Sequence, residues 1–153
     1  MIPNAIARGI PRALQAEHEE LREALTRLAN ETGQIGEAGS EVKALFDGHA
    51  AREEQYALPP LGLLAPLAAG AVTTDAPAAI ALSRQLRLEL PDMLDDHLAI
   101  VAALQILLDK ANELGRPDAS DVARRLILHA QLEEEVLYPA AILVGKYLEE
   151  RGG

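Results

Sequence analysis

The sequence contains no cysteine, which excludes disulfide bonds, thiolate metal sites and cysteine nucleophiles. Only 3% of the residues are aromatic and β-branched residues are sparse, whereas Ala and Leu dominate, a composition that favours helix over sheet. Basic residues are also few, because 14 Lys and Arg stand against 24 Asp and Glu and leave a formal net charge of −10. This negative charge argues against nucleic acid or an anionic membrane as a partner.

Long uninterrupted apolar runs are missing as well. Prolines, a glycine and arginines interrupt residues 1–15, so this stretch has no continuous apolar core of signal-peptide length. The uncharged stretch 55–74 contains three prolines, so we expect no membrane span there. We expect a single cytoplasmic domain over residues 1–153, a length that buries about two thirds of the surface of the unfolded chain.

Apolar residues recur at helical spacing in four segments, each with a stripe of positions alternately three and four residues apart. The segments are residues 11–32, 40–58, 75–114 and 118–148. In the first two segments the predicted inward stripes are Leu14, His18, Leu21, Leu25 and Leu28, and then Val42, Phe46, His49, Glu53 and Tyr56. In the third segment the predicted stripe is Leu82, Leu86, Leu90, Leu94, His97, Val101, Leu104, Leu108 and Ala111. In the fourth segment it is Val122, Leu126, His129, Glu133, Val136, Ala140, Leu143 and Tyr147.

The connections between these segments predict how they are arranged. A glycine-containing turn over residues 33–39 separates the first two helices, and Ser40 is the expected N-cap of the second. Residues 61–74 read as a connection with one short helical piece, and Asp118 or Ser120 is the expected cap of the fourth helix.

Three connections between four helices predict an all-α, up-down-up-down antiparallel four-helix bundle. Proline lacks a backbone N–H and disturbs a helix interior. Pro91 should therefore kink or split the third helix, and Pro139 should leave a short C-terminal tail helix.

All four histidines of the chain fall on the inward stripes, and so do two glutamates that each follow a histidine by four residues. The six residues are His18, His49, Glu53, His97, His129 and Glu133. The pattern is a histidine followed later by His-x-x-x-Glu, and it occurs twice. Residues four apart lie on one face of a helix, so each imidazole and carboxylate point the same way. Positions along the helices predict that all six share one layer of the bundle.

Two interpretations of this layer compete. A lone histidine in an apolar stripe is usually a satisfied core residue, and buried His–Glu hydrogen bonds are the structural alternative. However, four imidazoles and two carboxylates in a dry layer are costly to bury without cations, so we favour metal binding. Six nitrogen and oxygen ligands exceed one four-coordinate zinc site and suit two ions, and the ligand types admit iron, manganese or zinc. By chain order, His18 with His49 and His97 with His129 would each hold one ion, with Glu53 and Glu133 as bridges.

These residues resemble the hemerythrin HHE cation-binding domain family. The resemblance covers nearly the whole chain and includes the pairs Leu58-Pro59 and Tyr138-Pro139. It implies two iron ions with an oxo or hydroxo bridge that bind or sense dioxygen or nitric oxide, held by the four histidines and bridged by the two glutamates. Oxygen carriers of the family have a further histidine four residues before the third-helix ligand, where this sequence has Met93. The sequence therefore resembles the broader group of sensors, iron-handling proteins and stress proteins rather than the carriers.

Two other functions remain open: a di-iron oxidase or peroxidase, and an iron-handling or metal-stabilised bundle. The sequence offers no recognisable polar substrate pocket, which favours a binding protein over an enzyme. Glu17, Glu20 and Asp96 neighbour the histidines and either accept their second ring N–H or are simply solvated. Tyr56 either packs in the core or reaches a bound ligand. The apolar segment 58–72 either covers the bundle end or forms a homodimer contact.

Overall fold

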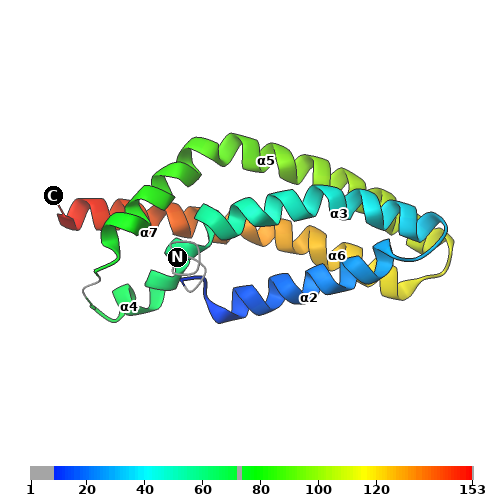
Figure 1. Cartoon of the computed structure of the whole chain (residues 1–153), viewed down its shortest axis with the longest axis horizontal. Coiled ribbons are helices and arrows are strands. Elements are labelled where there is room, and N and C mark those ends of the chain that lie inside the picture. The colour runs from blue at the N-terminus through cyan, green and yellow to red at the C-terminus, as the bar shows by residue number, and fades with distance from the viewer. Residues whose placement is uncertain (1–8, 72–73, 153) are drawn as a thin grey trace.

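A computed structural model describes residues 9–71 and 74–152, and these contain helices but no strand (Figure 1). The elements are α2 (Arg12–Ala29), α3 (Gln34–Arg52), the π-helical turn η1 (Glu53–Ala57), the 3-10 turn η2 (Pro59–Leu63), α4 (Leu64–Ala68), α5 (Ala76–Glu113), α6 (Pro117–Leu132), the π-helical turn η3 (Glu133–Leu137) and α7 (Tyr138–Gly152). Together they form an all-helical bundle, as predicted.

Helices α2, α3, α5 and α6 run lengthwise through the molecule (Figure 1). The connections α2–α3 and α5–α6 lie at one end, and the short α4 lies at the other (Figure 1). α7 continues the line of α6 and packs against α5 and η2. Within the described residues, no helix is long and apolar enough to cross a membrane.

The turn between α2 and α3 is shorter than predicted. α3 begins directly after Gly33, whose φ of 88° is a left-handed conformation that favours glycine. Gly36 and Gly39 therefore lie inside the helix, where the absence of a side chain lets α3 approach the end of α2. A Cβ atom at Gly36 would lie 1.7 Å from the backbone oxygen of Glu31. Ser40 is not the N-cap, because its hydroxyl donates to the last carbonyl of α2 at 3.2 Å.

The start of α6 also differs from the prediction. The helix begins one residue before Asp118, and its N-cap position is Arg116 and neither of the two predicted residues. Ser120 instead donates to Oδ1 of Asn112 at 2.7 Å, across the turn from α5. Arg116 binds Glu31 through two hydrogen bonds of 2.8 Å each and also contacts Asp118 at 2.9 Å. These contacts join the two connections at this end of the bundle.

Of the two alternatives predicted at Pro91, the split is wrong, because α5 is one continuous helix. Its ribbon changes direction along its length, as the alternative of a kinked helix expected (Figure 1). Its inward stripe also differs from the prediction on both sides of His97. Ser83, Met93, Ile100 and Leu107 are buried, whereas the predicted residues Leu82, Leu90, Leu94, Val101 and Leu108 are only partly buried. With 3.6 residues per turn, positions three and four residues ahead flank the same face, and spacing alone did not choose between them.

The two π-helical turns begin at the two inward glutamates, Glu53 and Glu133. Each glutamate is followed six residues later by a proline, Pro59 or Pro139. Proline donates no backbone hydrogen bond, and its ring crowds the carbonyl of the preceding turn. A π turn relieves this crowding by placing one additional residue in the turn, a feature often found at functional sites.

The additional residue in η3 shifts the inward stripe of the last helix by one position. The predicted inward residues Val136, Leu143 and Tyr147 are 51%, 62% and 44% exposed. The residues that are buried instead are Tyr138, Ala141, Val144 and Leu148. The tail helix is also not short, because α7 has 15 residues and packs along α5.

The connection after η1 contains the predicted short helical piece, as η2 and α4. Its first part, residues 58–61, is buried within this chain and packs in an apolar cluster with residues of η1, α5 and α7. Leu64 in α4 is 43% exposed. Only the later part of the predicted dimer segment is therefore accessible, and the homodimer stays a prediction.

Candidate metal centre

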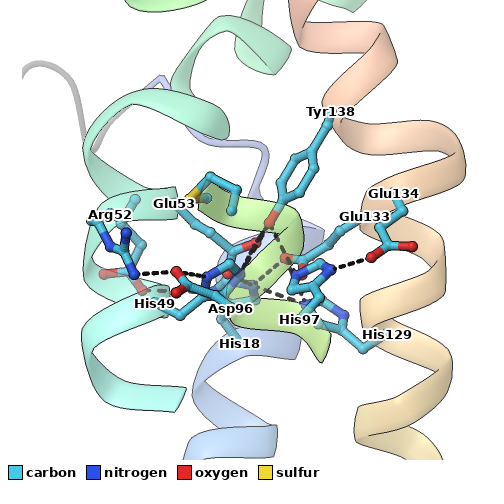
Figure 2. Close-up of polar contacts among 12 residues, drawn as sticks. His18, His49, Arg52, Glu53, Asp96, His97, His129, Glu133, Glu134 and Tyr138 are labelled. Carbon is cyan, nitrogen blue, oxygen red and sulfur yellow. Dashed lines mark hydrogen bonds and ion pairs between the residues drawn. The ribbon is translucent and has the colours of Figure 1, made fainter. Parts of the chain in front are cut away.

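The structure brings all six predicted ligand residues into one layer of the bundle (Figure 2). They come from α2, from α3 and η1, from α5, and from α6 and η3, and each is at most 6% exposed. Apolar clusters lie on both sides of this layer. The layer is therefore a buried polar region between two dry ones.

The six residues form two groups that could each hold a metal ion. One group contains His49, Glu53, His97 and Glu133, and the other contains His18, His129 and Glu133. The Nε2 atoms of His18 and His129 are 3.0 Å apart, and the ring centroids of His49 and His97 are 4.6 Å apart. The pairing expected from chain order, His18 with His49 and His97 with His129, differs from these two groups and stays a prediction. Glu133 belongs to both groups, as a bridging carboxylate would.

Each imidazole directs Nε2 to the interior of the layer and Nδ1 to a carboxylate at its rim. The four Nδ1···O contacts are His18–Glu54 (3.6 Å), His49–Asp96 (3.0 Å), His97–Glu134 (3.0 Å) and His129–Glu17 (2.5 Å). The contacts of His49 and His97 are hydrogen bonds, whereas those of His18 and His129 lack hydrogen-bond geometry. A carboxylate at one ring nitrogen orients the ring and leaves the other nitrogen free to bind a metal.

The sequence indicated only half of this rim. Glu17 and Asp96 were candidates, whereas Glu20 contacts Arg125 at 3.9 Å instead. Glu54 and Glu134 were missed, although each directly follows an inward glutamate. Each rim carboxylate is next to a predicted ligand in the sequence but contacts the histidine of another helix, so only the tertiary structure reveals its partner.

Cations also contact the rim. Arg22 donates to Glu54 at 2.9 Å, and Arg52 donates to Asp96. Figure 2 shows Arg52, Asp96 and His49 in line at one edge of the layer. Arg52 therefore holds Asp96 against the imidazole of His49.

Tyr138 is a further residue of the layer that the sequence did not predict. Its hydroxyl donates to Oε2 of Glu53 at 2.5 Å and lies 3.1 Å from Nε2 of His49 and 3.2 Å from Nε2 of His97 (Figure 2). In a regular α-helix, a residue five positions after Glu133 points away from it. The additional residue of η3 turns Tyr138 inward, so the signal was the proline that follows it.

Tyr56 and Met93 lie beside the layer rather than in it. The Tyr56 hydroxyl donates to Oε2 of Glu89 at 2.8 Å and contacts the Met93 sulfur at 3.2 Å. Met93 is fully buried in the position where oxygen carriers of the resembled family have a histidine. Tyr56 therefore acts as a core residue with a satisfied hydroxyl, as the packing interpretation expected.

The carboxylates of the layer have opposite pKa shifts. Burial, together with the nearby Glu133 carboxylate, raises the pKa of Glu53 to about 7. Burial also acts to raise the pKa of Glu133, but hydrogen bonds from Glu53 and from three of the histidines hold it well below its usual value. In the absence of cations, the two carboxylates therefore share protons with the groups around them.

The pKa values of the four imidazoles are all shifted in the same direction. Burial acts to lower their pKa values, but contacts with the buried glutamates and with carboxylates of the rim outweigh it and raise all four pKa values. The pKa of His129 rises to about 9. A bound divalent cation compensates the negative charge of the same carboxylates, so that no proton is needed. Imidazole together with carboxylate is a donor set that suits iron, manganese or zinc. The residues therefore fit a metal centre.

The comparisons with known proteins agree with this donor set. The model of the family described as "Hemerythrin HHE cation binding domain" matches residues 9–141, a range that contains all six residues. No curated protein and no solved structure matches the chain. The chain belongs to the hemerythrin HHE cation-binding domain family.

Proposed function

We propose that the protein binds two iron ions and uses them to bind or sense dioxygen or nitric oxide. The observation that carries this proposal is the layer of four imidazoles and two carboxylates, buried between apolar clusters with every Nε2 directed inward. The family membership supports a cation as the occupant. Manganese or zinc suits the same donors.

The proposed ligands of the ions are His18, His49, His97 and His129, with Glu53 and Glu133 as bridges. Glu133 supports a bridging role most directly, because its Oε1 lies 3.1 Å from His97 and its Oε2 lies 3.1 Å from His129. Two divalent ions add four positive charges to a layer whose carboxylates and one hydroxide supply three negative ones. This near balance makes burial tolerable.

A reduced iron pair would supply the electrons and open coordination positions that dioxygen and nitric oxide require. The chain itself supplies a dry surrounding, because Leu21 and Leu25 are buried on one side of the layer and Leu58 and Leu86 on the other. Met93 replaces the additional histidine of the oxygen carriers. We therefore propose sensing or binding rather than reversible oxygen transport.

The proposal includes the chain topology. We infer that α2, α3 with η1, α5, and α6 with η3 run alternately up and down, as the positions of the connections support (Figure 1). In this arrangement each helix contributes its ligands at the same height.

Metal analysis of freshly purified protein, combined with absorption spectra before and after admission of oxygen, tests the proposal. We expect two iron ions per chain and a visible spectrum that changes when the reduced protein meets oxygen. A silent spectrum with two irons bound would count against the binding or sensing function.

The same preparation separates the other functions. Turnover of peroxide beyond one equivalent per site, lost in His129→Ala, would identify an oxidase or peroxidase. Ready release of iron, or zinc loading with no oxygen response, would identify a metal-handling or metal-stabilised bundle.

A further inference from the structure

Five large apolar side chains lie exposed along α6, η3 and α7. They are Leu128, Leu132, Val136, Leu143 and Tyr147, which are 66%, 37%, 51%, 62% and 44% exposed. The first two lie four residues apart in α6 and the last two lie four residues apart in α7, so each pair shares one face of its helix. Single exposed apolar residues are ordinary, but an aligned set of this size is typical of an interaction surface.

These five residues, here called the outer stripe, form one continuous surface. α7 continues the line of α6 (Figure 1). Both helices bury the opposite face, α6 with Leu126 and Ala130 and α7 with Ala141 and Leu148. The line of α6, η3 and α7 extends over residues 117–152 and is therefore about 50 Å long. The outer stripe occupies the side of this line that faces away from the bundle.

Hollows on both sides widen the surface around the outer stripe. One of about 380 Å³ lies between α6 and α2, and Leu21 of α2 lines it together with residues of the stripe. Another, of about 340 Å³, lies between α7 and α5 and is lined by Leu143, Leu90 and Leu94. A helix face about 50 Å long and 10 Å wide gives roughly 500 Å² per chain, against about 800 Å² in a standard interface. The hollows supply further area for a partner that inserts side chains into them.

The charge around the outer stripe favours a second copy of this chain as the partner. The chain has a net charge of −10, so two copies repel unless they meet through a face with few acidic residues. Apart from the glutamates of η3, residues 122–148 include no acidic residue, and they contain Arg124, Arg125 and Lys146. An acidic protein can therefore approach this face at a lower electrostatic cost.

An antiparallel arrangement matches the outer stripe with itself. Leu128 and Tyr147 are its two ends, and Leu132 and Leu143 each lie four residues inside an end. A two-fold axis beside residues 137–138 therefore places Leu128 opposite Tyr147 of the second copy. The same axis places Leu132 opposite Leu143 of the second copy. Such a two-fold contact uses the same surface on both chains and closes at two copies.

The charges at the ends of the outer stripe agree with this register. Arg124 and Glu150 are both exposed, and the two-fold axis places each opposite the other, with one such pair at each end. Exposed pairs of this kind select a register more than they add affinity. Arg125 and Arg151 also come near each other across the axis. Both have a contact in their own chain, Arg125 with Glu20 at 3.9 Å and Arg151 with the Tyr147 hydroxyl at 3.0 Å.

We propose that two copies of this chain pair antiparallel through the outer face of α6, η3 and α7. The paired surface is separate from the apolar segment 58–72, which the sequence suggested as a dimer contact. It contains none of the six candidate ligands in the outer stripe, so the pairing does not depend on the function proposed above.

Sedimentation velocity of the full chain tests the pairing. The wild type should be a dimer, and Leu128→Glu with Leu143→Glu should raise its dissociation constant about 100-fold or more, because two carboxylates per chain would be buried against apolar side chains. Leu98→Glu is the matched control, because Leu98 is 72% exposed but lies on α5. Leu64→Glu tests the alternative contact through α4. Both controls should remain dimers, and circular dichroism checks that every variant is folded.

The absence of cysteine from the chain allows a direct test of the register. Leu132→Cys with Leu143→Cys in one chain should give a disulfide-linked dimer when the thiols are oxidised with diamide, as seen by non-reducing electrophoresis. Each single variant should stay unlinked, because the register separates equal positions by 11 residues, about 16 Å along the helix. Bridged cysteines have Cα atoms within about 7 Å of each other.

Several results would overturn the proposal. A wild-type chain that is monomeric at every concentration measured would do so. So would a dimer that survives Leu128→Glu with Leu143→Glu, or one that Leu64→Glu or Leu98→Glu dissociates instead. Cross-links in either single-cysteine variant, or none in the double variant, would overturn the antiparallel register.

Discussion

The layer of the six candidate ligands and the apolar cluster next to it are stabilised by different interactions. This cluster, here called the distal core, fills the half of the bundle near the α2–α3 and α5–α6 connections. Its buried residues are Leu21, Leu25, Leu28, Ile35, Ala38, Val42, Phe46, Ala50, Ile100, Leu104, Leu107, Ala111, Ala119, Ala123 and Leu126. Burial of apolar surface stabilises such a core by about 25 cal/mol per Å² whether or not a cation is present. The layer instead buries six ionisable groups, which is costly until cations or protons compensate them.

The comparison shows that one bundle can divide its tasks along its length. The distal core holds the helices together, so the fold tolerates a layer of ionisable side chains whose burial is unfavourable. A change in the distal core should lower the stability of metal-free and metal-loaded protein equally. A change in the layer should act on metal binding first. The following experiments test this division, beginning with the largest expected effect.

Replacement of Glu133 by alanine should abolish the binding of two ions, because Glu133 is the residue shared by both groups. The metal content of the purified variant, measured by elemental analysis, should fall from two ions to fewer than one per chain. Glu135→Ala, an exposed neighbour in the same turn, is the control and should keep both ions. Full metal content in Glu133→Ala would contradict a bridging role.

Leu104→Ala should lower the free energy of unfolding by about 2–5 kcal/mol, because the side chain is fully buried and its loss leaves a cavity. Denaturant unfolding should show the same loss with and without chelator. A loss that depends on metal would mean that the distal core and the layer are not independent.

Gly36→Ala should destabilise the protein by roughly 1–3 kcal/mol, because the new Cβ would meet the backbone oxygen of Glu31, in the turn between α2 and α3, at 1.7 Å and displace this turn. Gly48→Ala in the same helix meets no atom within 4 Å and should instead stabilise it by about 0.5–1 kcal/mol. Thermal unfolding of both variants measures the contrast. Equal effects of the two changes would show that the close contact of α3 with the preceding turn does not matter.

The smallest effect should be a dependence on pH of the stability that metal binding adds to the fold. The raised imidazole pKa values stabilise the metal-free fold at acidic pH, and this contribution is lost as the pH rises through the folded values, about 9 for His129. Metal binding requires unprotonated imidazoles, so it strengthens over the same range. The difference in Tm between loaded and chelated protein should therefore widen between about pH 6 and pH 9. A constant difference would mean that protons and metal do not compete for the layer.

Much of the fold and the positions of the six candidate ligands followed from helical spacing alone. A histidine on an inward stripe remains inward as long as the helix is regular, so His18, His49, His97 and His129 were placed correctly. Glu53 and Glu133 were also placed correctly, because the π turns begin at these residues and leave the preceding helix undisturbed.

The remaining features depend on interactions that spacing does not encode. Tyr138 and the rest of the last helix were assigned to the wrong face, because one additional residue in η3 rotates everything after Glu133. The grouping of His18 with His129, and the contacts of Glu54 and Glu134, depend on which helices are neighbours across the bundle. The start of α3 was predicted too late, because the glycines of residues 33–39 suggested a turn. Gly36 instead lies inside the helix, where it allows close packing.

The paired prolines have a consequence for how the site is filled. Because Pro59 and Pro139 belong to the covalent chain, the widened turns at Glu53 and Glu133 exist before any ion arrives. The backbone of the site is thus preorganised, so we expect uptake of the proposed ions to exchange protons without refolding the helices.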